Sequence, residues 1–303
     1  MSKLKILVWN LQDLFIFVDK RKDESISSLN EPKWQQLSSS LKPNKPLEKI
    51  KAIATLIDQV SPDICLFTEA GGKESLNNLN SLFLNDKFIV VHHKSNSDRG
   101  IDLGVLIQKT SSLNFTHKFH NHSVFARGIL ELKLTINNNY FHFLLTHLKS
   151  KLNLKGVDFE GRKQRKREVA QIVKVAEKIL LKKNTHVAVT GDLNGIISKD
   201  TNDYELDQFA TNLGLIDCLE HLNHTNFDRA TYLYYNKQRE AIFMQLDYFL
   251  MDKNLAKMLD NKTKVLDFSG AVRTNYPKNY KEKIAHPSDH YPLYVELNLD
   301  SNF

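Results

Sequence analysis

Polar and acidic side chains stand directly after the apolar, strand-like runs of this chain, and the pattern repeats from one end of the sequence to the other. If the ends of the corresponding strands converge, four carboxylates and two histidines meet in one cleft. Burial and mutual repulsion disfavour such a cluster unless a cation joins it. Mg²⁺ suits it, because this ion takes oxygen ligands and keeps waters and phosphate oxygens in its shell. The positions concerned are Asn10, Glu69, His147, Asp192 with Asn194, Asp247, and Asp289 with His290.

Apolar periodicity predicts many strands and few helices. One helix is expected over 47–60, where Ser61 and Pro62 end it, a second over 162–183, and a weaker one over 204–213, closed by Gly214. Interleaving of this kind indicates two packed sheets flanked by helices. Strands are expected at 4–9, 64–67, 101–108, 129–136, 140–146, 186–190, 241–251 and 291–297.

Length and composition favour a single domain. With 303 residues, 41% of them hydrophobic and 25% charged, the chain resembles an average globular protein. We expect one domain over 1–303, with a polar surface insertion at about 19–46. Cys65 and Cys218 are far apart, so neither a disulfide nor a cysteine metal site is expected. An interrupted apolar N-terminus and the lack of a run of roughly 20 apolar residues predict a cytoplasmic protein without a transmembrane segment, which we expect to be a monomer.

The positive charge is concentrated in one region. The formal net charge is +7, and residues 149–183 hold twelve Lys and Arg against four acids. Such a concentration indicates a polyanionic partner, although the solvated face of an amphipathic helix would look the same. Because the run follows His147, its cations are candidates for substrate phosphates along the rim of the site. They are Lys149, Lys151, Lys155, Arg162, Lys163, Arg165, Lys166 and Arg167.

Six short motifs, in order along the chain, together resemble the endonuclease/exonuclease/phosphatase (deoxyribonuclease I-like) superfamily. Each is weak alone, whereas all six in the family's order, each after a predicted strand, form a specific signal. The resemblance implies an α+β fold, a four-layer α/β sandwich of two mainly antiparallel sheets between helices. The motifs are Val8-Trp9-Asn10-Leu11, Phe67-Thr68-Glu69, Thr146-His147-Leu148, Thr190-Gly191-Asp192-Leu193-Asn194, Leu246-Asp247-Tyr248 and Pro287-Ser288-Asp289-His290.

The resemblance also implies roles. It makes Glu69 the principal ligand of Mg²⁺, for which Mn²⁺ could substitute, with Asn10 beside it and Asp289 nearby or at a second ion. Asp192 and Asn194 would position the attacking water, and Asp247 would polarise His290; the base is Asp192 or His290.

Two further residues carry alternatives. His147 would contact phosphate or protonate the leaving oxygen, as in the branches of deoxyribonuclease I, sphingomyelinase and inositol-polyphosphate phosphatase, or it is a structural histidine under the sheet. Arg127 would grip a substrate phosphate or is an ordinary surface arginine.

Three functions fit these features. The first is a Mg²⁺-dependent nuclease that cleaves DNA or RNA by in-line attack of water. The second keeps that chemistry on phospholipid headgroups, inositol phosphates or another small phosphoester, because fold analogy does not choose a substrate. The third, a catalytically inactive binding protein, is disfavoured by the intact motifs.

Overall fold

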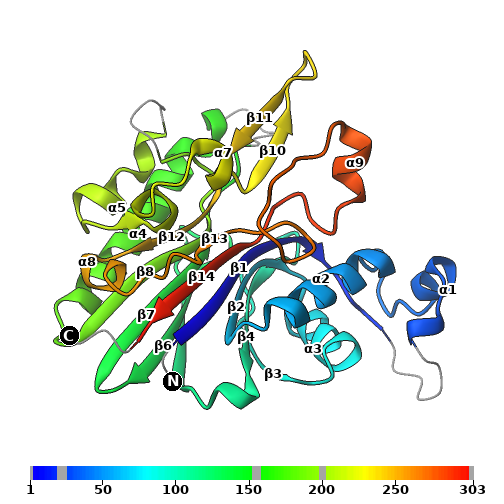
Figure 1. The fold of residues 1–303 in the computed structure, drawn as a ribbon, viewed down its shortest axis with the longest axis horizontal. Helices are drawn as coiled ribbons and strands as arrows, with labels where there is room; N and C mark the ends of the chain where they lie inside the picture. The colour runs from blue at the N-terminus through cyan, green and yellow to red at the C-terminus, as the bar shows by residue number, and fades with distance from the viewer. Residues whose placement is uncertain (1–2, 19–25, 152–157, 198–202, 300–303) are drawn as a thin grey trace.

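The computed structural model describes residues 3–18, 26–151, 158–197 and 203–299. Two six-stranded sheets pack face to face, with helices on their outer faces (Figure 1). The expected four-layer α/β sandwich is therefore confirmed. Both sheets are mixed but mainly antiparallel, and each contains a parallel pair, β1 with β2 and β7 with β8.

The first sheet carries Asn10 within its strand at 3–14 and Glu69 near the end of its strand at 64–70, whereas Asp289 and His290 precede its strand at 293–298. Its strand order is β13-β14-β1-β2-β4-β3. Its outer face is covered by helices α1 (Glu31–Gln36), α2 (Leu47–Val60) and α3 (Gly72–Phe83) (Figure 1). The strands are β1 (Lys3–Leu14), β2 (Ile64–Ala70), β3 (Phe88–His92), β4 (Asp102–Gln108), β13 (Lys264–Val265) and β14 (Leu293–Asn298).

The second sheet has the order β5-β6-β7-β8-β12-β9. Helix α4 (Arg162–Leu180) covers its outer face, with Val169, Ile172, Val173, Ala176 and Ile179 buried, as the sequence predicts. The strands are β5 (Asn114–His120), β6 (Ile129–Ile136), β7 (Asn139–His147), β8 (Thr185–Asp192), β9 (Ile216–Asp217) and β12 (Asp247–Met251).

Successive side chains of the central strands point alternately to the two faces of the sheet, and this forms the layers. In β1, Leu4, Ile6 and Val8 pack between the sheets, whereas Leu7 and Trp9 pack against the outer helices. A strand buried on both faces reads as an almost continuous apolar run, which is why these strands are visible in the sequence. Cys65 and Cys218 are buried free thiols.

Three elements differ from their prediction. The run at 241–251 is two strands, because β11 (Ala241–Met244) leaves the sandwich to pair with β10 (Tyr232–Tyr235) in a separate hairpin, and β12 begins at Asp247. The weak helix at 204–213 is split into a 3-10 turn, η4 (Tyr204–Leu206), and α5 (Gln208–Thr211). The described part of the 19–46 segment contains α1, whose Trp34 is fully buried and donates Nε1–H to the Lys45 carbonyl at 2.9 Å.

The remaining described helices are short and lie in connections. The sequence patterns did not identify them, because three to six residues carry too little periodicity. They are η1 (Ile26–Ser28), η2 (Lys109–Ser111), η3 (Phe159–Gly161), α6 (Cys218–His221), α7 (Asn226–Arg229), α8 (Lys253–Ala256) and α9 (Tyr280–Ala285). Across the described parts of the chain, every helix is too short or too polar to cross a bilayer.

Candidate active site

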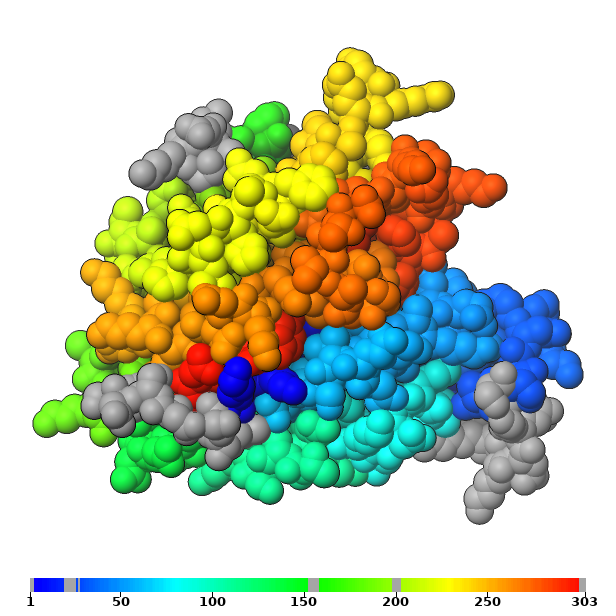
Figure 2. Space-filling model, in the orientation of Figure 1, coloured from blue at the N-terminus to red at the C-terminus, as the bar shows by residue number. Residues whose placement is uncertain are grey.

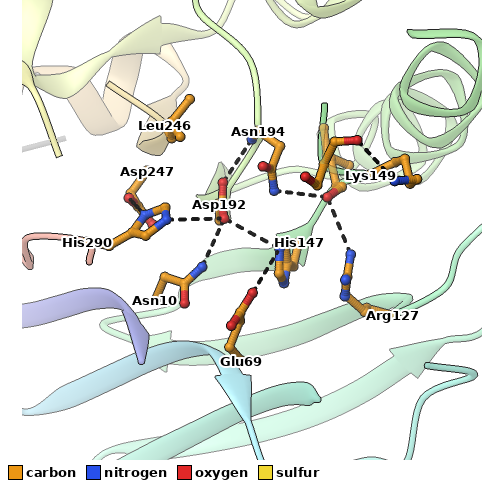
Figure 3. A network of polar contacts seen from close by, with 12 residues as sticks. Asn10, Glu69, Arg127, His147, Lys149, Asp192, Asn194, Leu246, Asp247 and His290 are labelled. Atoms are coloured by element: carbon orange, nitrogen blue, oxygen red, sulfur yellow. Dashed lines mark hydrogen bonds and ion pairs between the residues drawn. The ribbon is translucent and has the colours of Figure 1, made fainter. Parts of the chain in front are cut away.

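The polar residues that follow the strands meet around one carboxylate, Asp192 (Figure 3). Its Oδ2 accepts a hydrogen bond from Asn10 Nδ2 at 2.9 Å, and the same oxygen lies 3.4 Å from His147 Nε2. Glu69 Oε1 approaches His147 Nε2 to 3.9 Å. These four side chains come from β1, β2, β7 and β8, so the cluster joins both sheets.

Asp247 and His290 form the other side of the cluster. Asp247 starts β12 directly opposite Asp192 in the antiparallel ladder. Its Oδ2 lies 2.7 Å from Nδ1 of His290, whose Nε2 faces Asp192 Oδ2 at 4.0 Å. A carboxylate on Nδ1 holds a proton there and orients the ring. His290 therefore presents Nε2 to the centre of the site.

Unusual backbone conformations place these side chains. Glu69 and Asn194 have left-handed φ angles of 58° and 49°, and the ladders of β1 and β2 shift register between Asn10 and Leu14. Non-glycine residues adopt this conformation rarely and at some energetic cost. Gly191 has a φ of 115°, and a Cβ there would stand 2.2 Å from the Thr146 carbonyl. Glycine thus lets β7 and β8 approach closely enough to bring His147 beside Asp192.

Burial and mutual charge perturb the titration of the cluster. Burial raises the pKa of Asp192 and of Glu69, and the charges of Asp247 and Asp13, respectively, add to this. Burial together with the charge of Arg127 lowers the pKa of His147. Burial alone would also lower the pKa of His290, but the charge and hydrogen bond of Asp247 outweigh it and raise that pKa. The two histidines therefore differ: His147 is held neutral and His290 is held protonated.

Asn10, Glu69 and Asp289, the predicted metal ligands, lie at the edge of this cluster. Glu69 Oε2 accepts from Asp13 N–H at 3.1 Å, and Asp289 N–H donates to Gln12 Oε1 at 3.1 Å. Among the residues that the structure describes, no group of three or more His, Cys, Asp and Glu side chains forms a closed metal cage. Mg²⁺ does not need one, because it commonly binds through one or two carboxylates and keeps several waters.

Of the predicted phosphate-binding cations, two lie beside the site and two are held in ion pairs with acids. Arg127 is 9% exposed, points into the site from the start of β6 and donates to the Leu148 carbonyl at 3.5 Å, so it is not a surface arginine. Lys149, which also lies beside the site (Figure 3), is partly buried, and its pKa is lowered by burial. Lys151 is paired with Asp203 at 2.7 Å and Arg162 with Glu160 at 2.9 Å.

Arg165 was predicted among the cations along the rim of the site, and the structure shows that this prediction is wrong. It is fully buried, its Nε donates to Glu205 Oε1 at 2.9 Å, and it does not face a substrate. Helical periodicity puts it on the inner side of α4, whereas Lys163, Lys166 and Arg167 are exposed. Lys155 falls outside the described residues.

Several residues around the site were not identified from the sequence. Lys45 is buried and donates to the Gln12 carbonyl at 2.8 Å, and burial lowers its pKa to about 8. Arg99 pairs with Asp13 at 2.8 Å. Glu168 is 1% exposed and accepts from Lys149 N–H at 2.8 Å. Of these residues, only Glu168 could have been noticed in the sequence, because it is the one acid among the first eleven residues of the basic helix.

This sandwich, with carboxylates and imidazoles gathered where both sheets end, has the architecture of deoxyribonuclease I-like phosphoesterases. The chain belongs to the endonuclease/exonuclease/phosphatase family, whose sequence model matches residues 5–299. Members of this family are hydrolases that act on phosphodiester bonds. A comparison with curated proteins finds no match.

Solved structures of similar fold cover almost the whole chain. TDP2 from D. rerio, complexed with a single-strand DNA product, is 15% identical, covering 98% of this chain and 100% of that one at a TM-score of 0.60. The human Nocturnin catalytic domain with bound sulfate is 17% identical, with 97% and 94% covered and a TM-score of 0.60. AP endonuclease LMAP from Leishmania major is 12% identical, with 98% and 88% covered and a TM-score of 0.62.

Proposed function

We propose that this protein is a Mg²⁺-dependent nuclease that cleaves DNA or RNA by in-line attack of water on phosphorus. The observation that carries the proposal is the arrangement around Asp192, where a carboxylate oxygen, an amide and two imidazoles face one point. A phosphodiester at that point would meet a proton acceptor and several donors at once.

The donor set fits a hard divalent cation. Glu69 and Asp289 supply carboxylates and Asn10 an amide oxygen, which are the ligand types that Mg²⁺ prefers. The Glu69 carboxylate is 12% exposed, and burial, with a smaller contribution from the charge of Asp13, raises its pKa. When bound there, Mg²⁺ would draw negative charge from a phosphate oxygen.

The chain's own residues divide the proton work. Asp192 holds its orientation through hydrogen bonds from Asn10 Nδ2 and Asn194 N–H, both at 2.9 Å, and takes the proton of the attacking water. His290, which Asp247 keeps protonated, donates to a non-bridging phosphate oxygen from Nε2. Neutral His147, beside Asp192, binds the phosphate. As the water oxygen bonds to phosphorus, the P–O bond to the leaving oxygen breaks, and that oxygen takes a proton from solvent. These assignments give Asp192 rather than His290 the role of base.

Positive charge favours a polynucleotide over a small ester. The exposed cations Lys163, Lys166 and Arg167 lie along the first turns of α4. Cations that bind successive phosphates are one element of nucleic acid binding. The D. rerio TDP2 structure contains single-strand DNA, which agrees with this substrate class.

A substrate panel tests the proposal. Wild type, Glu69→Ala and the control Glu74→Ala, an exposed acid on α3, are assayed on DNA, RNA, phospholipid vesicles and p-nitrophenyl phosphodiesters in Mg²⁺ and in chelator. We expect Mg²⁺-dependent cleavage of nucleic acid that falls on the order of 10²-fold in Glu69→Ala and is unchanged in the control. Hydrolysis of lipid or small esters without nucleic acid cleavage would replace the nuclease with the second candidate function.

A further inference from the structure

The main chain that follows His147 is held by side chains from outside its own strand. The Leu148 carbonyl accepts from Asn194 Nδ2 at 3.2 Å and from Arg127 Nη1 at 3.5 Å. Leu148 N–H donates to the Asp192 carbonyl at 2.9 Å, which is the last backbone hydrogen bond between this segment and β8. Beyond Leu148 the segment leaves the sheet.

Two residues of α4 hold the next peptide units. Glu168 Oε2 accepts from Lys149 N–H at 2.8 Å, and Arg165 Nη1 donates to the Lys149 carbonyl at 3.0 Å. Arg165 also donates to the Glu160 carbonyl at 2.8 Å. The backbone N–H and the backbone carbonyl of Lys149 are therefore both bound by charged side chains on one face of α4.

The imidazole of His147 lacks the support that His290 has. His290 is oriented through Nδ1 by Asp247, whereas Nδ1 of His147 is buried and has no hydrogen-bond partner in the described parts of the chain. A ring whose second nitrogen is free takes its orientation from packing and from the backbone that carries it. The hydrogen bonds to the backbone of residues 148 and 149 are thus the polar contacts nearest to His147 on its C-terminal side.

Stability does not account for this arrangement. Arg165 and Glu205 are fully buried, and Glu168 is 1% exposed. Well-packed apolar residues in place of buried ionic groups are often neutral or stabilising, since desolvation offsets much of the attraction between the charges.

We propose that Glu168, supported by Arg165, is a positioning residue that fixes His147 at the phosphate site through the backbone of Leu148 and Lys149. The proposal rests on the phosphodiesterase function proposed above, because it assigns a part in that reaction. It also explains why two charged residues within the basic helix face inward, away from any polyanion.

Kinetics of three variants test it. Glu168→Met keeps the size of the side chain and removes the acceptor, Glu168→Gln keeps an acceptor oxygen, and Glu177→Met makes the first change at an exposed position of α4. We expect kcat to fall at least about tenfold in Glu168→Met with KM within twofold, since one group that stabilises the transition state contributes roughly 10²- to 10³-fold. Glu168→Gln should retain most of the rate, and Glu177→Met all of it. An unchanged kcat in Glu168→Met would overturn the proposal.

A double-mutant cycle separates positioning from general damage. If Glu168 acts through the imidazole, Glu168→Met should lower kcat by less than twofold in a His147→Ala background, because the group that it positions is gone. An equal loss in both backgrounds would mean that the residue acts elsewhere, and the proposal would be wrong.

A readout without substrate distinguishes this proposal from the proposed function. Hydrogen exchange at the Lys149 amide should accelerate in Glu168→Met, and the ring resonances of His147 should shift while those of His290 stay in place. If wild type hydrolyses no phosphodiester but these changes occur, the proposed function fails and the positioning contact stands. If neither the exchange nor the ring changes, the positioning role fails whatever the activity.

Discussion

Replacing Asp247 with asparagine should disable the site while leaving the fold intact. The Asp247 side chain is fully buried, and its Oδ2 lies 2.7 Å from His290 Nδ1. Asparagine has the same shape, so the packing of β12 survives. Only the negative charge that keeps His290 protonated is lost.

The structure sets the expected size of the effect. A hydrogen bond to a charged group contributes about 1.5–3 kcal/mol, which corresponds to about 10- to 150-fold in rate. Asp247 Oδ1 has no hydrogen-bond partner among the described residues, so the new amide nitrogen can occupy that side and leave the amide oxygen on Nδ1. The hydrogen bond then persists without its charge, and we expect a loss of kcat near the lower end of this range.

The assay is the pH dependence of kcat for wild type, Asp247→Asn and the exposed control Asp207→Asn. Because Asp247 raises the pKa of His290, removing its charge lowers that pKa, and activity should decline at lower pH on the alkaline side. The melting temperature should change little. Equal kcat and an unchanged alkaline limb in Asp247→Asn would refute the pairing of Asp247 with His290 as a source of catalysis.

Three further predictions concern stability and substrate binding. Hydrogen bonds from His120 and His142 outweigh burial and lower the pKa of Glu131 to about 2, so its stabilisation, roughly 2–3 kcal/mol, is present above about pH 4.5 and lost as pH falls toward 2. Urea unfolding of Glu131→Gln should therefore show a deficit that shrinks with acidification, and a deficit independent of pH would contradict this. Trp34→Ala should cost about 3–5 kcal/mol in the same assay, because Trp34 is fully buried; a loss below about 1 kcal/mol would show that α1 is peripheral. Replacing the exposed cations Lys163, Lys166 and Arg167 with alanine should flatten the salt dependence of nucleic acid affinity by about 0.9 per lost phosphate contact, with kcat retained, and an unchanged slope would place the substrate elsewhere.

Charged residues that are neighbours in the sequence do not all lie on the same surface. Residues 158–180 appear as a basic tract in the sequence, yet α4 turns Arg165 and Glu168 toward the sheet and Lys163, Lys166 and Arg167 toward solvent. The segments on the face shown in Figure 2 likewise come from distant parts of the sequence, since chain ends and middle lie side by side. Which charges share a surface depends on helix phase and packing rather than on sequence distance.

Local sequence was enough for four of the strands that carry the site, but not for β12. Doubly buried strands such as β1, β2, β7 and β8 have long apolar runs, so their positions, and the polar residues at their ends, follow from hydrophobicity alone. The same reasoning failed at 241–251, because one continuous apolar pattern serves both the hairpin strand β11 and the sheet strand β12. Pairing partners lie far away in the chain, and no local pattern encodes them.

The sequence by itself therefore determined which residues are polar at strand ends, that the chain has two sheets with flanking helices, and that its motifs resemble one family. Only the tertiary structure decided that Asp192 stands between His147 and His290, and that Arg165 faces inward. The physical reason is that residue type and periodicity are local properties, whereas distances, burial and the resulting charge states arise when strands separated by up to 280 residues, as Asn10 and His290 are, meet at one edge of two sheets.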